Sequence, residues 1–276
     1  MRIDAHQHFW YFNPVRDSWI TSEMQALKRD FLPSDLYPHL KSNSITGCVA
    51  VQADQSENET NFLLSLAAKN DFIKGVVGWI DLRSNNLVER LEHYSQFELL
   101  KGFRHVVQAE AKGFLEGGSF IDGVKKLVRF NFAYDLLIYH HQLEEAISFV
   151  GKLNEIRIVV DHLAKPPIKS NDIASWKRGI TELAKFENVS CKISGMVTEA
   201  DWDNWHEADF HPYLDTLLES FGTKRLLYGS DWPVCLLAAS YDQQLSIVEN
   251  YLSKLSTPER NDIMGLNAVR IYQLKI

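Results

Sequence analysis

The stretch Gly47–Asn70, GCVAVQADQSENETNFLLSLAAKN, joins a strand-like segment to a helix-like one. Gly47–Ala53 is a short apolar run with the length and composition of a buried β-strand. Further on, Phe62, Leu63 and Leu66 fall on one stripe of a helix. One strand followed by one helix is the repeating unit of a parallel sheet covered by helices.

The same unit recurs along the whole chain. A helix-like segment follows each strand-like run, and the last one begins at Thr257 as N-cap, with Pro258 in its first turn. Eight units at this length predict a (β/α)8 TIM barrel that forms one domain over residues 1–276. The rival is an open doubly wound sheet, but no GxGxxG or Walker motif follows any strand. The eight predicted strands are Ile3–His8, Gly47–Ala53, Lys74–Asp81, Lys101–Gln108, Tyr134–His140, Arg157–Leu163, Val189–Gly195 and Arg225–Asp231.

Composition and charge are those of an ordinary globular protein. The 276 residues are 45% hydrophobic and 24% charged, enough for a sizeable core. The net charge of −7 gives no general attraction to nucleic acid. Cys48, Cys191 and Cys235 lie far apart without a CxxC pair, which favours buried thiols over disulfides. No signal peptide precedes Ile3 and no apolar run is long enough for a bilayer, so we expect a cytoplasmic protein without membrane or nucleic-acid partners.

Histidines gather at the expected carboxyl ends of the strands. His6 and His8 form an HxH pair on the first strand, while His140 and His162 stand near the ends of the fifth and sixth. Asp231 ends the eighth strand. In a parallel barrel these ends meet at the face that holds the active site, so the five side chains are expected to converge. An HxH pair alone would also fit two ordinary polar residues at a strand end.

The geometry of a strand predicts how this pair points. Side chains at positions i and i+2 lie on the same side, so both imidazoles should face the barrel axis. Asp4 has the same parity and is expected to orient His6 from behind. His141 adjoins His140, and either of the two could face inward.

In kind and in order, these residues resemble the amidohydrolase superfamily, and within it the sugar-lactonase branch. The resemblance implies an amidohydrolase-like (β/α)8 barrel that hydrolyses a sugar-acid lactone, L-fuconolactone or a related aldonolactone, to the free acid. Such an activity belongs to carbohydrate metabolism, including fucose degradation, and needs no organic cofactor. The resemblance covers nearly the whole chain and rests on the blocks IDAHQHFW (3–10), GFRHVVQAE (102–110), VVDHLAKP (159–166), CKISGMVTEADW (191–202) and GSDWPVCLLAASYD (229–242).

The fourth strand departs from the two-metal members of the superfamily, which usually carry a lysine or another bridging ligand there. Here the strand supplies Arg104 and His105, and neither is a bridging carboxylate. The resemblance therefore implies at most one divalent ion, an optional Zn²⁺ whose candidate ligands are His6, His8, His140 and Asp231.

Lactone hydrolysis gives each of the central side chains a role. Asp231 is the candidate base, which takes a proton from water and passes it to the leaving ring oxygen. His6, His8 and His162 would polarise the carbonyl, either themselves or through one ion. The alternative for Asp231 is a salt-bridged structural carboxylate.

Four further residues are predicted to contact the substrate. Arg104 would hydrogen-bond its hydroxyls or the developing carboxylate, and an internal ion pair is an equal alternative. Gln52 ends the second strand and Lys192 lies on the seventh. Trp232 directly follows the candidate base, and aromatic rings stack well on the apolar faces of sugars.

Two other functions compete with the lactonase. A metal-dependent decarboxylase of an unsaturated or aromatic acid would share the HxH pair and the aspartate of the eighth strand, but it needs a tightly held metal. A non-catalytic sugar-binding barrel would bind a lactone without changing it. The sequence also leaves a homodimer open.

Overall fold

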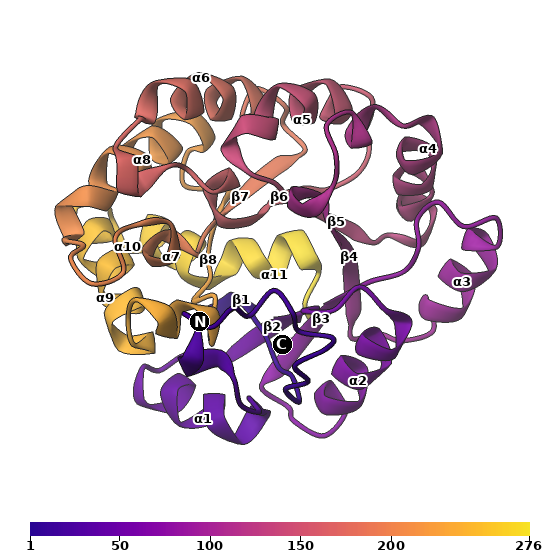
Figure 1. Ribbon diagram of the computed structural model, residues 1–276, viewed down its shortest axis with the longest axis horizontal. Helices are drawn as coiled ribbons and strands as arrows, with labels where there is room; N and C mark the ends of the chain where they lie inside the picture. The colour runs from indigo at the N-terminus through magenta and orange to yellow at the C-terminus, as the bar shows by residue number, and fades with distance from the viewer.

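The computed structural model describes residues 1–276 and contains one sheet of eight parallel strands in sequential order, with helices around it (Figure 1). The predicted barrel is therefore confirmed. The last strand reaches the first through the residues that follow it, because the amide of Asp231 donates to the carbonyl of His6 over 2.8 Å. The strands are β1 Ile3–Gln7, β2 Gly47–Val51, β3 Ile73–Gly78, β4 Leu100–Val106, β5 Ala133–Leu137, β6 Ile158–Val160, β7 Val189–Ile193 and β8 Leu226–Tyr228.

Helices follow the strands as the periodicity predicts, and no helix is both long and apolar enough to cross a membrane. The predicted last helix is wrong in two details. A π-turn at 262–266 divides it, and its N-cap is Ser256, whose amide donates to the Glu259 carboxylate over 2.9 Å. The helices are α1 Pro33–Ser42, α2 Glu57–Ala67, α3 Leu87–Tyr94, α4 Gly118–Lys126, α5 Leu143–Val150, α6 Ile173–Leu183, α7 Met196–Glu199, α8 Glu207–Phe221, α9 Tyr241–Leu252, α10 Thr257–Asn261 and α11 Asn267–Tyr272.

All eight strands stop earlier than the sequence predicts. The difference matters most in β6 and β8, which end at Val160 and Tyr228 instead of Leu163 and Asp231. The backbone leaves the extended conformation just beyond them: φ is 51° at His162 and 56° at Asp231. Both of these candidate site residues therefore lie on turns beyond the strand ends, where side chains no longer alternate between the two faces of the sheet.

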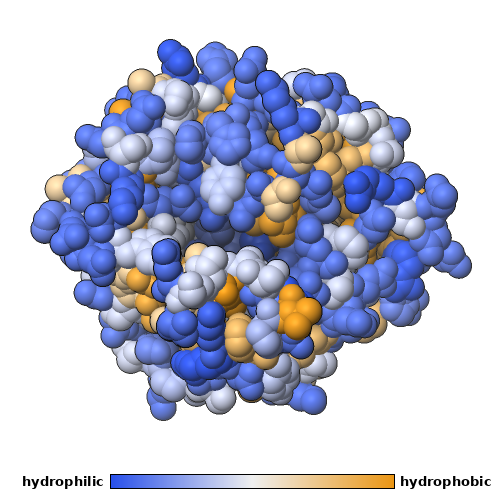
Figure 2. All heavy atoms as spheres, viewed as in Figure 1, coloured by the Kyte–Doolittle hydropathy of each residue, from blue (hydrophilic) through white to orange (hydrophobic).

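Helix α11 closes the amino-terminal end of the barrel. Figure 1 shows it lying across the centre of the ring of strands. Its side chains Ala268, Ile271 and Tyr272, with Leu274 just beyond, pack in one buried cluster with inward-facing residues of six strands, among them Ile3. Because this end is plugged, only the carboxyl-terminal face offers entry to the interior. Figure 2 shows a hollow near the centre of a face of the molecule, with hydrophilic residues at its bottom.

A β-bulge in β1 changes the predicted orientation of Asp4. In the register with β2, Asp4 pairs with Cys48 but Gln7 pairs with Ala50, so β1 contains one extra residue between them. The extra residue leaves Asp4 on the outer side of the sheet, where it accepts a hydrogen bond of 3.0 Å from the Tyr241 hydroxyl. It binds the backbone amide of His6, not the imidazole. The expectation that Asp4 orients the His6 ring is therefore wrong.

Candidate active site

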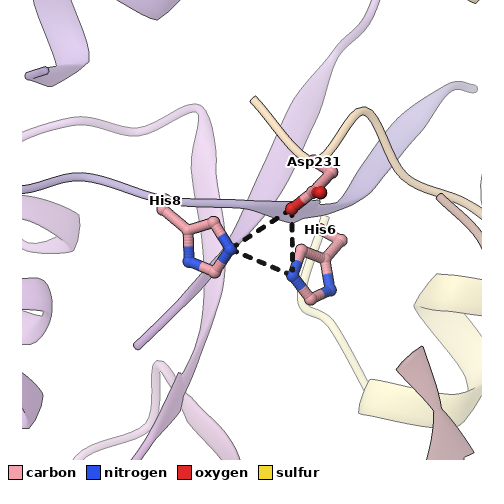
Figure 3. A group of neighbouring side chains, drawn as sticks. All are labelled: His6, His8 and Asp231. Atoms are coloured by element: carbon pink, nitrogen blue, oxygen red, sulfur yellow. Dashed lines mark hydrogen bonds and ion pairs between the residues drawn. The ribbon is translucent and has the colours of Figure 1, made fainter. Parts of the chain in front are cut away.

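Three side chains converge at the bottom of the carboxyl-terminal face (Figure 3). His6 and His8 come from the end of β1, and Asp231 comes from the turn after β8. The His6 and His8 Nε2 atoms are 3.2 Å apart, and Asp231 Oδ1 lies 3.4 Å from His8 Nε2 and 3.8 Å from His6 Nε2. His8 and Asp231 keep 5% and 4% of their surface exposed, whereas His6 is fully enclosed. Only a small substrate group can therefore reach this point.

The spacing of these three atoms fits a single divalent ion. Nitrogen and oxygen ligands about 2.1 Å from a tetrahedral zinc ion lie about 3.4 Å from one another. His8 also has the tautomer that a ligand needs, because its Nδ1 donates to the carbonyl of Val51 over 2.8 Å and its Nε2 keeps a free lone pair. His6, His8 and Asp231 thus form a cluster that could hold one metal ion.

The structure does not bring His140 to this cluster. β5 ends at Leu137, and a 3₁₀ turn over 140–142 takes the chain off the strand before His140 can point inward. His140 Nδ1 instead donates to the carbonyl of Lys165 over 3.0 Å, and His141 stacks on Tyr139. Neither histidine belongs to the groups whose ligand atoms lie close enough for a metal.

A left-handed turn after β6 places His162. Residues 162–165 have φ values of 51°, 57°, 57° and 47° although none is glycine, and each such residue costs roughly 1–2 kcal/mol. The turn is held by Trp176, whose indole donates to the carbonyl of Leu163 over 2.6 Å. It brings the His162 ring centre to 4.3 Å from that of His6 and its Nε2 to 3.9 Å from Asp231 Oδ1. His162 Nδ1 lies 2.9 Å from the Ser194 hydroxyl.

Gly195 leaves room for this ring, and replacing it gives a first prediction. Its φ is +62°, and an added Cβ would lie 2.6 Å from His162 Nδ1. We expect Gly195→Ala to lose about 1–2 kcal/mol of folding stability and, because His162 is displaced, at least about tenfold in kcat. Gly113→Ala is the matched control: its φ is +92° with nothing within 4 Å of the added Cβ, so it should lose stability alone. Equal kcat losses in both would contradict the role of His162. Urea unfolding and steady-state kinetics measure the two effects.

A cluster of buried charges lies directly beneath the histidines. Lys192 Nζ lies 2.5 Å from Asp135 Oδ2, 2.9 Å from Asp161 Oδ1 and 3.1 Å from His6 Nδ1. Arg104 Nη1 donates to Asp161 Oδ2 over 3.0 Å. The two aspartates were missed in the sequence, although strand parity could have found them. Asp135 comes two positions after Ala133, and Asp161 comes two positions after Val159; Ala133 and Val159 both face the barrel interior.

Three predicted substrate contacts are placed elsewhere. Lys192 and Gln52 have no exposed surface, so neither can touch a ligand in this conformation. The Lys192 ammonium is held below the histidines by carboxylates. The backbone carbonyl of Gln52 accepts a hydrogen bond from Arg104 Nη2. The Trp232 ring packs in the core, with its centre 5.3 Å from that of Phe31. Arg104 keeps 4% of its surface exposed, and the ion pair that was its alternative role is present.

Burial and neighbouring charges set the protonation of the site. Burial lowers the pKa of His6 well below 6.5 and that of His162 from 6.5 to about 4, so both are neutral at pH 7. Burial alone would raise the pKa of Asp231, but His162 and the HxH pair outweigh it and hold this pKa below 3.8. Asp231 is therefore an ionised carboxylate beside neutral imidazoles, which is the state required of a general base or a metal ligand.

Comparisons with known proteins agree with this geometry. The family model described as amidohydrolase matches residues 3–274. An L-fucono-1,5-lactonase from Burkholderia multivorans is 41% identical over 286 residues, with 99% of this chain and 96% of that protein covered. A second L-fucono-1,5-lactonase, from Burkholderia ambifaria, is 32% identical over 278 residues, covering 99% and 96%. The crystal structure of a Burkholderia multivorans amidohydrolase with bound zinc superposes with a TM-score of 0.97 at 40% identity and covers 100% of both chains.

Proposed function

Because the chain belongs to the amidohydrolase family, we propose that it hydrolyses the lactone of a sugar acid, with L-fucono-1,5-lactone or a related aldonolactone as substrate. The product is the free sugar acid, and the enzyme is a carboxylic ester hydrolase. The names of the two relatives that match over nearly their full length support the substrate class. The observation that carries the chemistry is the ionised Asp231 carboxylate among His6, His8 and His162 at the carboxyl-terminal end of the barrel.

Asp231 supplies the base in this reaction. A water molecule beside its carboxylate gives up a proton to Asp231 as the water oxygen attacks the lactone carbonyl carbon. When the tetrahedral intermediate collapses, the bond from this carbon to the ring oxygen breaks. Asp231 then returns the proton to the ring oxygen, so the base is regenerated and the ring opens to the hydroxy acid.

The developing oxyanion needs donors that the substrate can reach. His162 Nε2 and the Arg104 guanidinium are the donors at the edge of the enclosed cluster, since both residues keep a small exposed surface. Donors fixed in a dry site stabilise such charge far better than water does. When bound, a divalent ion at His6, His8 and Asp231 supplies Lewis acidity to the same oxygen. We propose zinc as that ion, which a related structure contains.

A panel of lactones tests the function. The enzyme is incubated with L-fucono-, L-rhamnono- and D-galactonolactones, and acid release is followed with a pH indicator. We expect L-fuconolactone to react fastest. Parallel reactions with a chelator, and with the chelator followed by Zn²⁺, measure how much of the rate depends on the metal. No acceleration with any aldonolactone would exclude this function, and release of carbon dioxide from an aromatic acid would favour the decarboxylase instead.

The pH dependence of kcat/KM gives a second prediction. Burial lowers the pKa of His162 to about 4, and the histidines hold that of Asp231 lower still. Of these two groups His162 is the first to be protonated on acidification, and its positive charge weakens the basicity of the neighbouring Asp231. We expect kcat/KM to stay level from about pH 8 to about pH 5 and to fall near pH 4. An acid limb near pH 6.5, the value of an ordinary histidine, would contradict it; circular dichroism checks that the fold persists.

The cellular location and the oligomeric state stay predictions. All three cysteines are buried and unpaired, which supports a reducing compartment such as the cytoplasm. Cell fractionation in the source organism tests the location, and light scattering of the purified protein shows whether a homodimer forms.

A further inference from the structure

The Nδ1 atom of His6 faces a donor and an acceptor at once. Lys192 Nζ lies 3.1 Å from it and Asp161 Oδ1 lies 3.3 Å from it. A neutral imidazole carries one N–H, so Nδ1 can accept from Lys192 or donate to Asp161, but it cannot do both. The choice decides whether the opposite nitrogen, Nε2, carries the proton or a lone pair.

Both neighbours have fixed roles. An ammonium can only donate, and Lys192 has three N–H groups for Asp135, Asp161 and His6. Asp161 pairs with two cations, since Lys192 Nζ lies 2.9 Å from its Oδ1 and Arg104 Nη1 lies 3.0 Å from its Oδ2, and these contacts favour the ionised carboxylate. It can therefore only accept. Neither neighbour needs to change its protonation for His6 to change its tautomer.

The other end of the chain of hydrogen bonds is anchored at His8. The carbonyl of Val51 only accepts, so His8 Nδ1 carries the proton and its Nε2 presents a lone pair to His6 Nε2, 3.2 Å away. Without an ion, the favourable arrangement has Lys192 donating to His6 Nδ1 and His6 Nε2 donating to His8. Arg104 Nη1 also approaches His6 Nε2, but at 3.4 Å, and it has a shorter bond of 3.0 Å to Asp161.

A cation between the two Nε2 atoms reverses this arrangement, since it needs a lone pair on each of them. The proton of His6 then moves to Nδ1, where Asp161 Oδ1 accepts it. We propose that Lys192 and Asp161 are positioning residues that let His6 switch tautomer. Lys192 stabilises the Nε2–H form in the metal-free enzyme, and Asp161 stabilises the Nδ1–H form when a divalent ion is bound. One proton moves across one ring and the net charge of the protein side chains is unchanged.

The switch deepens the proposed active site and rests on its metal-binding cluster. It also explains why the buried Lys192 contacts His6, because Asp135 and Asp161 alone would be enough to neutralise the charge of Lys192. It also means that His6 meets a partner at each nitrogen in either state, so the site does not depend on an ion for its structure. The tautomer and the lactonase rate are measured separately. A failed switch with intact lactone hydrolysis would therefore reject this inference alone.

Nitrogen-15 spectroscopy tests the switch. The protein is labelled with [¹⁵N]histidine, and its ring nitrogens are recorded at pH 7 after chelation and again after addition of Zn²⁺ alone. A His6→Gln variant assigns the His6 signals. In the metal-free protein we expect Nε2 to have the shift of a protonated nitrogen and Nδ1 that of an unprotonated one. With Zn²⁺ the protonated shift should appear at Nδ1. The same tautomer in both samples would overturn the proposal.

Variants show which residue sets the tautomer. Lys192→Met removes the donor, so His6 should be Nδ1–H even without metal. Because this variant leaves carboxylates unpaired, Lys192→Met with Asp135→Asn is the second form, and the same tautomer is expected in it. Tyr272→Phe is the matched control: the hydroxyl donates to Asp135 over 2.8 Å but does not touch His6, so the switch should persist. An unchanged tautomer in the metal-free double variant would show that Lys192 does not hold it.

Discussion

Asp231→Asn is expected to lower kcat for lactone hydrolysis by roughly 10²–10⁴-fold, the usual contribution of a general base. The substitution keeps the size of the side chain and removes only its charge and basicity. The backbone should tolerate it, because Asp231 has a φ of 56° and asparagine is among the residues that adopt this left-handed conformation most readily. KM should change much less than kcat, since the residues around Asp231 stay in place.

The control for this variant is Asp215→Asn. Asp215 is a carboxylate of α8 that pairs with Lys254 on the surface, and it should keep the parent kcat. If Asp231→Asn retained more than about a tenth of the parent kcat, Asp231 would be a structural carboxylate, the alternative that its ion contacts with three histidines allow. Stopped assays with L-fuconolactone, together with unfolding curves of all three proteins, separate these outcomes.

The barrel could be predicted from the sequence because buried parallel strands are nearly continuous apolar runs. Their ends could not. The run RIVVDHL (157–163) keeps a strand-like residue pattern beyond Val160, where β6 ends. The left-handed φ of His162 could not be predicted either, because no glycine marks the turn. Tertiary bonds hold that turn, among them the one from the Trp176 indole to Leu163, and such bonds are invisible to local pattern.

The candidate site shows the same division. His6 and His8 point the same way, as strand parity predicts, because the extra residue of the β1 bulge lies before His6 and leaves the pair in phase. Asp231 reaches the pair from the turn after β8. Asp4 lies on the other side of that bulge and is turned outward. Lys192 was correctly placed on β7, but its enclosure depends on Asp135 from β5 and on Asp161, which directly follows β6. A single sequence gives the residues of such a network without their partners.

Lys192→Met should cause the largest loss of stability that the structure predicts, about 3–5 kcal/mol in the free energy of unfolding. Lys192 has no exposed surface, and its ammonium bridges the carboxylates of Asp135 and Asp161. Methionine fills much of the same volume, so lost packing contributes little. The cost arises because two buried carboxylates lose their shared cation. Asp161 keeps Arg104, whereas Asp135 keeps only the hydroxyl of Tyr272.

A double-mutant cycle isolates that cost. In Lys192→Met the Asp135 carboxylate keeps only the Tyr272 hydroxyl as a partner, and Asp135→Asn removes that carboxylate. The loss in free energy of unfolding of the double variant should therefore be smaller than the sum of the two single losses by more than about 1 kcal/mol. Lys185→Met is the matched control: its ammonium is 2.7 Å from Glu182 but both side chains are exposed, so little change is expected. Urea unfolding at pH 7 measures the parent and the four variants. Additive losses in the cycle would mean that Lys192 and Asp135 are not coupled. The loss in Lys192→Met would then come from changed packing around the side chain.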